Sequence, residues 1–180
     1  MESQKYDITA KPDTDGTPSV KQLKSMLKKL LAERFQLAFH HDKKELSVYA
    51  LTVAKGGPKL NKSEGDPNGL PGLFFAGRMV LNVRNAALMD FTGLMQATVL
   101  DRPVVDQTGL AGRWDFTLKW TPDETQFGGQ IPGPPAPTDA ADAPPDLFTA
   151  IQQQLGLKFE PAKTAVDVLV IDKAEKPSEN

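Results

Sequence analysis

The chain has 180 residues, of which 39% are hydrophobic and 24% charged, the balance of an ordinary globular protein with one domain or two small ones. Its net charge of −2 comes without a block of like charges, which excludes the basic stripe that nucleic-acid-binding proteins place against phosphates. It has no cysteine, which excludes disulfides and thiol chemistry, and no apolar run approaches the roughly 20 residues that a membrane span needs.

The first third of the chain predicts one helix among strands. Thr17 followed by Pro18 is typical of a helix N-cap and first helical position, and one apolar face then continues to Phe35. We expect, in order, a strand at 6–11, a helix at 18–34, a strand at 36–40, a turn at 42–45 and a strand at 46–55.

The rest of the chain predicts two more helices. Asn85 is a plausible N-cap for the second helix, and Asp146 for the third, which Gly156 should end. The apolar face of the second helix is marked by Leu88, Phe91, Met95 and Val99. Strands are expected at 78–83, 102–106, 113–120, 157–160 and 166–173, with a loop at 61–73 and a flexible, proline-rich loop at 122–145.

Two parts of the sequence match each other. Residues 6–11 parallel residues 114–119 at an offset of 108, and residues 27–54 align without a gap to residues 147–174 at an offset of 120. The matched positions are mostly apolar ones that should face a core. We therefore predict an α+β fold of duplicated βαββ units, with helices packed on mixed β-sheet and a pseudo-two-fold axis.

The predicted units overlap within one compact domain. The first covers 1–60, a central β-α-β-β unit covers 74–120, and the last covers 113–180, including the proline-rich loop.

The central segment has Asn85-Ala86-Ala87-Leu88-Met89-Asp90 after a strand, then Val104-Val105-Asp106, a glycine turn and a further strand. This order resembles the small periplasmic βαββ modules of secretins and TonB-dependent receptors. It covers roughly 40 residues. What it implies is an interaction module rather than an enzyme.

A second resemblance covers nearly the whole chain. The segments that carry it are Leu30–Leu37, Val48–Leu60, Arg102–Leu110 and Val168–Glu179. Together they resemble an uncharacterised family of exported proteins from soil bacteria, abundant in acidobacteria, whose domains also occur at the extracytoplasmic end of antirepressor-type membrane metallopeptidases. The resemblance implies a periplasmic or secreted location. It also leads us to expect an export signal and a strand-rich segment ahead of Tyr6 in the natural protein.

The candidate chemistry is sparse. His40 and His41 with Asp42 and Glu45 offer a weak surface metal site, but adjacent residues of a strand point to opposite faces. A polar strand end is the simpler interpretation.

Two aspartate motifs also have simpler interpretations. Asp106-Gln107-Thr108-Gly109 is more typical of a strand-ending turn with glycine at positive φ than of a catalytic aspartate. Asp7 and Asp115 occupy equivalent repeat positions, where they would do acid–base work only if they met.

The remaining features assign no site. Gly56-Gly57-Pro58 lacks the lysine and the following helix of a phosphate loop. Trp120 and Phe127 flank the proline-rich loop and offer a binding surface, although aromatic residues more often belong to a core. We assign no catalytic, cofactor-binding or metal-binding residue.

Three functions are compatible with this sequence. The first is a non-catalytic extracytoplasmic interaction or sensing domain with a protein or peptide partner. The second is a carboxylate-dependent hydrolase, which requires Asp7, Asp115 or His40 to converge in one pocket. The third is a peptide or small-ligand binder that uses a sheet edge.

Overall fold

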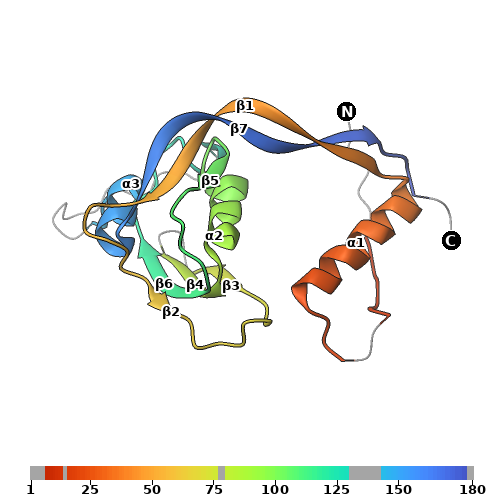
Figure 1. Cartoon of the computed structure of the whole chain (residues 1–180), viewed down its shortest axis with the longest axis horizontal. Helices are drawn as coiled ribbons and strands as arrows, with labels where there is room; N and C mark the ends of the chain where they lie inside the picture. Colours follow the sequence, from red (N-terminus) through yellow and green to blue (C-terminus); the bar gives the residue numbers. More distant parts are fainter. Residues whose placement is uncertain (1–6, 14–15, 77–79, 130–142, 178–180) are drawn as a thin grey trace. The chain divides into compact units, whose positions relative to one another are not determined.

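The computed structural model describes residues 7–13, 16–76, 80–129 and 143–177. Its contacts divide the chain into two compact units: unit 1 consists of residues 1–40 and 169–180, and unit 2 of residues 41–168. Two long strands, β1 (Ala38–Val53) and β7 (Leu157–Lys173), belong to both units and pair with each other (Figure 1). The repeat boundaries expected at 1–60, 74–120 and 113–180 stay a prediction.

Unit 2 contains most of the sheet structure, and the α+β class is confirmed. One sheet has the order β2-β6-β4-β3 and is antiparallel throughout. In the other sheet β1 lies between β7 and β5, and its pairing with β5 is parallel. The further strands are β2 (Asn61–Lys62), β3 (Gly72–Phe75), β4 (Val80–Ala86), β5 (Val104–Asp106) and β6 (Trp114–Lys119).

The predicted loop at 61–73 is wrong where it meets β2 and the start of β3. Both are short strands at the two edges of the antiparallel sheet. They are extended because β2 pairs with β6 and β3 pairs with β4, and not because of local propensity.

The second predicted helix covers the core of unit 2. It consists of α2 (Leu88–Leu94) and a π-helical turn, η1 (Met95–Val99). Its predicted apolar face is confirmed, since Leu88, Phe91, Met95 and Val99 are all buried.

The predicted N-cap of this helix is wrong. Asn85 lies in β4 at an irregularity of the pairing with β6, and its backbone is left-handed (φ +48°). The N-cap is Ala87, whose amide donates to Asp90 Oδ2 at 3.0 Å.

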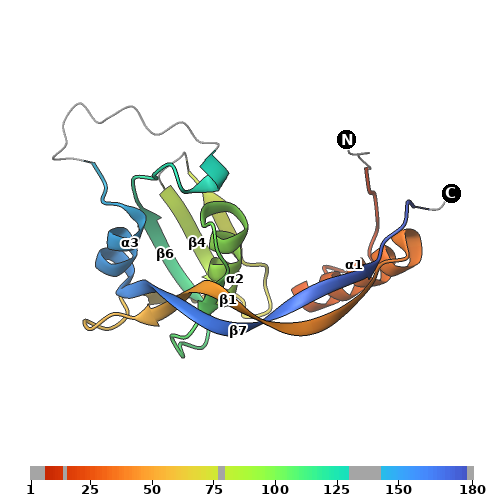
Figure 2. The same cartoon turned by 90° about the horizontal axis from the view of Figure 1, so that it is seen from above.

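The third helix confirms both of its predicted ends. It consists of α3 (Leu147–Ala150) and the π-helical turn η3 (Ile151–Leu155). The Asp146 carboxylate accepts the Thr149 amide at 3.1 Å, and Gly156 ends the helix with φ +64°. In Figure 2, α3 is seen next to β6, with which η3 exchanges two hydrogen bonds between the Gln154 side chain and the Lys119 backbone.

The turn predicted at 42–45 is wrong, because β1 runs through it, and the strands predicted at 157–160 and 166–173 are one continuous strand, β7. The Thr52 hydroxyl donates to the Glu160 carboxylate, and His40 Nδ1 is hydrogen-bonded to the Asp172 carboxylate. Moving twelve residues forward along β1, from His40 to Thr52, therefore corresponds to moving twelve residues back along β7, from Asp172 to Glu160. The two strands are therefore antiparallel. Pairing with a distant partner keeps extended a polar segment that favours a turn on its own.

Unit 1 contains one long helix, α1 (Val20–Phe35), close to its predicted span. The predicted cap at Thr17 is wrong: Ser19 is the N-cap and forms a reciprocal capping box with Gln22. The strand predicted at 6–11 is absent from residues 7–11, the part of it that the structure describes.

Most of the proline-rich segment, residues 130–142, lies outside the described residues. Before it, η2 (Phe127–Gly129) forms a short 3-10 turn, and after it Pro145 accepts the amide of Thr121 at 2.9 Å. Duplication of a βαββ unit stays a prediction.

Candidate functional site

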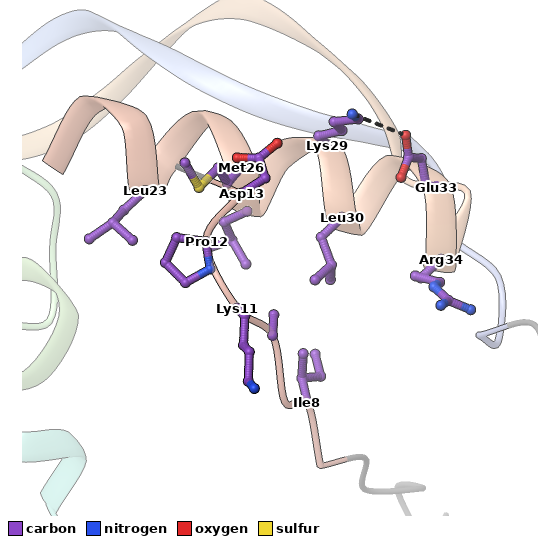
Figure 3. A pocket seen from close by; sticks show the side chains of 12 residues that line it. Ile8, Lys11, Pro12, Asp13, Leu23, Met26, Lys29, Leu30, Glu33 and Arg34 are labelled. Carbon is purple, nitrogen blue, oxygen red and sulfur yellow. Dashed lines mark ion pairs between the residues drawn. The ribbon is translucent and has the colours of Figure 1, made fainter. Parts of the chain in front are cut away.

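An apolar groove of about 680 Å³ lies in unit 1 between α1 and residues 8–13 (Figure 3). Its floor is formed by Leu23 and Leu30 of the helix, which face Ile8 and Pro12 of the extended segment. Charged side chains form its rim; they are Lys11, Asp13, Lys29, Glu33 and Arg34. An apolar floor inside a charged rim is the pattern of a surface that binds another molecule.

The helix face along this groove is largely open to solvent. No residue of α1 is fully buried, and Leu23 and Leu27 are 38% and 53% exposed. Amphipathic helices of globular proteins usually bury such a stripe against a sheet or a second helix. The open stripe therefore marks α1 as a helix that lacks part of its cover.

The end of α1 is nevertheless firmly attached to the neighbouring strands. The Glu175 amide donates to the Phe35 carbonyl at 2.7 Å, and Lys173 Nζ donates to Gln36 Oε1 at 2.9 Å. Lys28 Nζ lies 5.9 Å from the centre of the Phe39 ring. The open face therefore belongs to a helix that is held in place at its C-terminal end.

Helix α1 and strand β1 end at positions that correspond to the ends of η3 and β7, 120 residues later. Helix α1 ends at Phe35 and η3 at Leu155, each followed by a left-handed residue, Gln36 and Gly156. Strand β1 ends at Val53 and β7 at Lys173. The helix ends, caps and strand ends thus correspond at the offset that aligns the two sequences.

The burial of the matched residues differs. Leu147, Ile151 and Leu155 are fully buried, because β6 covers their helix. Their matches Leu27, Leu31 and Phe35 are exposed or half-buried. Of these three matches Leu27 lines the groove, so the groove includes an exposed leucine whose counterpart Leu147 is buried in unit 2.

The end of β7 shows the same contrast. Leu169 is 52% and Ile171 61% exposed, whereas Leu51, the match of Ile171, is fully buried. In unit 2 the match of Leu169, Tyr49, pairs with β5 and lies under the Arg102 guanidinium, 5.3 Å from its ring centre. Burial is the main cause that raises the pKa of Tyr49.

The two neighbouring histidines fall in different units of the chain. His40 belongs to unit 1, where its Nδ1 lies 2.8 Å from Asp172 Oδ1, and both side chains are about half exposed. His41 belongs to unit 2. Within the described ranges, no group of three His, Asp or Glu side chains could hold a metal ion.

Asp106 and Asp115 both accept hydrogen bonds. Strand β5 ends at Asp106, whose carboxylate accepts the amide and hydroxyl of Thr108, and Gly109 has φ +69°. This confirms the strand-ending turn. Asp115 accepts the Asn85 amide at 2.7 Å in unit 2, whereas Asp7 belongs to unit 1.

The aromatic pair beside the proline-rich loop is mainly core. Trp120 is fully buried, its Nε1 donates to Gln126 Oε1 at 2.8 Å, and it stacks on the half-buried Phe127. A binding surface at Trp120 is therefore wrong. Gly56-Gly57-Pro58 follows β1, and Gly57 closes a turn onto the Ala54 carbonyl at 2.9 Å.

Sequence reasoning missed the open surface of unit 1. It treated the face of α1 as core because its spacing matches that of a buried helix. The spacing alone carries no signal of exposure, because it is the same in a covered helix and in an open one.

Comparison with known proteins identifies a family for this chain but no individual related protein. No helix in the described part of the chain is long and apolar enough to cross a membrane. No curated protein and no solved structure matches the chain. A family model described as "Protein of unknown function (DUF3738)" matches residues 1–174. Because this match spans almost the whole sequence, the chain belongs to the DUF3738 family.

Proposed function

We propose that this chain is a non-catalytic interaction module that docks a β-sheet protein on the apolar face of α1. The single observation that carries the proposal is the contrast between matched helices. Leu147 is fully buried under a sheet, while Leu27 is 53% exposed. A β-sheet partner would give α1 the cover that β6 gives its counterpart.

The energetics favour such a cover. Burying a leucine side chain contributes about 1.5–3 kcal/mol, and Leu23, Leu27 and Ile8 are all exposed along the groove. The charged rim suits a surface that also exists without its partner, because charges around an apolar floor oppose nonspecific association.

A periplasmic or secreted location is part of the proposal. Its support is the resemblance of the four sequence segments to exported proteins. Cell fractionation with an antibody against this domain tests it, with the antigen expected outside the cytoplasm. Recovery of the antigen in the cytosolic fraction would contradict this location.

Site-specific photo-crosslinking tests the docking surface. A benzophenone amino acid is placed at Leu27 on the open face or, as a matched control, at Ser25 on the opposite side of α1. In the native cell envelope, Leu27 should yield one dominant adduct that mass spectrometry identifies as a β-sheet protein. Ser25 should yield at least about tenfold less of it. Equal adducts at both positions, or none at Leu27, would refute the docking surface.

A further inference from the structure

Resting on the proposed function, we infer that the partner supplies an extended strand that pairs in parallel with the outer edge of β7 at Leu169–Ile171. The register should be the one that β5 adopts on β1. The occupant is thus a strand-donating polypeptide, which joins the sheet through its backbone as well as covering the apolar helix face.

The pairing of β5 with β1 supplies the template. Tyr49 pairs with Val104 and Leu51 with Asp106, in parallel orientation. The Tyr49 amide donates to the Pro103 carbonyl at 2.8 Å, and the Gln107 amide donates to the Leu51 carbonyl at 2.9 Å. The amide of Tyr49 and the carbonyl of Leu51 therefore point away from β7 and towards β5.

Strand β7 has positions that match those of β1, but in the part of the chain that the structure describes no strand pairs with it there as β5 pairs with β1. At the offset of 120, Tyr49 corresponds to Leu169 and Leu51 to Ile171, and both matches are more than half exposed. In the sheet β5-β1-β7, β7 is an edge strand, and among the described residues its one partner strand is β1. The correspondence assigns the Leu169 amide and the Ile171 carbonyl to the outer edge of β7.

The composition of this edge gives an independent argument. Soluble proteins protect exposed edge strands with lysine, proline or bulges, because an open apolar edge pairs with other chains. Residues 166–171 read Val-Asp-Val-Leu-Val-Ile, with one charge, no lysine and no proline. An edge of this composition is expected where a second strand covers it in the functional state.

The template also indicates the chemistry of the donated strand. β5 places Val104 opposite Tyr49, Pro103 offers the carbonyl acceptor before it, and Asp106 ends the strand. The partner strand should carry a β-branched residue opposite Leu169, with its carbonyl acceptor one residue earlier.

Disulfide tethering tests the pairing and its register. Because the chain has no cysteine, Ile171→Cys creates a single thiol in the full chain. Peptides of residues 100–108 act as probes, with cysteine either at position 106, matched to Ile171, or at position 105, one residue out of register. Trapping is measured by intact mass in a glutathione buffer. A one-residue slip turns the side chain to the other face, so the matched peptide should be trapped at least about fivefold more.

A second variant tests the backbone contact. Adding Leu169→Pro to Ile171→Cys removes the amide that should donate to the peptide, and trapping should fall to the level of the mismatched peptide. Trp114 and Trp120 both lie in unit 2, whereas Leu169 lies in unit 1 with α1. Unchanged tryptophan fluorescence together with an unchanged far-ultraviolet circular dichroism spectrum shows that both units remain folded in this variant.

The outcomes separate this inference from the docking function. Equal trapping in both registers, no trapping, or trapping unaffected by Leu169→Pro overturns the strand pairing. If Leu27 still crosslinks to a partner, the docking function survives that failure. A disulfide-linked dimer of the Ile171→Cys chain formed without peptide would show that a second copy occupies the edge, and would overturn a separate strand donor.

Discussion

Leu27 and Leu147 occupy matched positions, 120 residues apart, in two helices that end in the same way, yet Leu147 is fully buried and Leu27 is 53% exposed. The difference arises from their neighbours, because the helix of Leu147 packs against β6. Matched sequence has therefore produced one covered helix and one open helix.

This contrast predicts different costs of truncation. Leu147→Ala should lower the free energy of unfolding by about 2–5 kcal/mol, because it leaves a cavity in a packed core. Leu27→Ala should change it by less than about 0.5 kcal/mol. Urea denaturation followed by far-ultraviolet circular dichroism and by tryptophan fluorescence measures both. A similar cost for the two variants would mean that α1 is covered within the isolated chain.

The buried pair Trp120 and Gln126 predicts a second stability effect. Gln126 is 2% exposed and is the acceptor for Trp120 Nε1, while its own Nε2 donates to Asp123 at 2.9 Å. Gln126→Leu should cost about 1–3 kcal/mol, because the indole N–H stays buried without an acceptor. Gln152→Leu, at an exposed position of η3, is the control and should cost much less. Equal stability of the two variants in urea would contradict the role of Gln126.

Replacing Gly93 and Gly156 by alanine should change the stability of the fold in opposite directions. Gly156 has φ +64°, and a Cβ there would collide with the Gly57 carbonyl, so Gly156→Ala should destabilise unit 2 by more than about 2 kcal/mol. Gly93 lies within α2 with open space around it, and Gly93→Ala should stabilise by up to about 1 kcal/mol. Thermal melts followed by tryptophan fluorescence measure both, and a shift of the same sign would contradict this account.

The cap at Asp146 predicts a pH dependence. Its hydrogen bonds with Thr149 hold the pKa of the carboxyl below its ordinary value of 3.8. Because the folded pKa is the lower one, the carboxylate stabilises the fold above pH 3.8, and this contribution is lost as the pH falls through the folded pKa.

Asp146→Asn keeps the cap and removes the titration. Relative to wild type, it should therefore be less stable at about pH 6 and recover that difference towards about pH 3. Asp146→Ala should cost about 1 kcal/mol near neutrality, because it removes the cap itself. Asp167→Asn, at an exposed position of β7, is the control. An Asp146→Asn difference that does not change with pH would rule out the linkage.

Predictions that rest on local chemistry agree best with the structure. The buried face of α2 and η1, the Asp146 cap and the Gly156 stop each follow from a few residues close in sequence. Such features form wherever their segment folds, because their hydrogen bonds and side-chain spacing lie within one or two turns.

Predictions that depend on distant partners fail in specific places. Asp42-Lys43-Lys44-Glu45 favours a turn locally, but β1 continues through it because β7 pairs alongside. Asn85 looks like a helix cap, but Asp115 holds its amide within a strand irregularity instead. Trp120 looks exposed beside a long loop, but Gln126 and Phe127 enclose it.

Local sequence was enough to predict the apolar faces of the helices and both ends of the third helix, because periodicity and capping depend on residues within a few positions of one another. Which apolar face is covered depends on long-range packing. Leu27 and Leu147 carry the same side chain in the same local pattern, and a strand that packs against one helix buries Leu147 alone. Burial depends on neighbours that are far away in the chain, so no local pattern contains it.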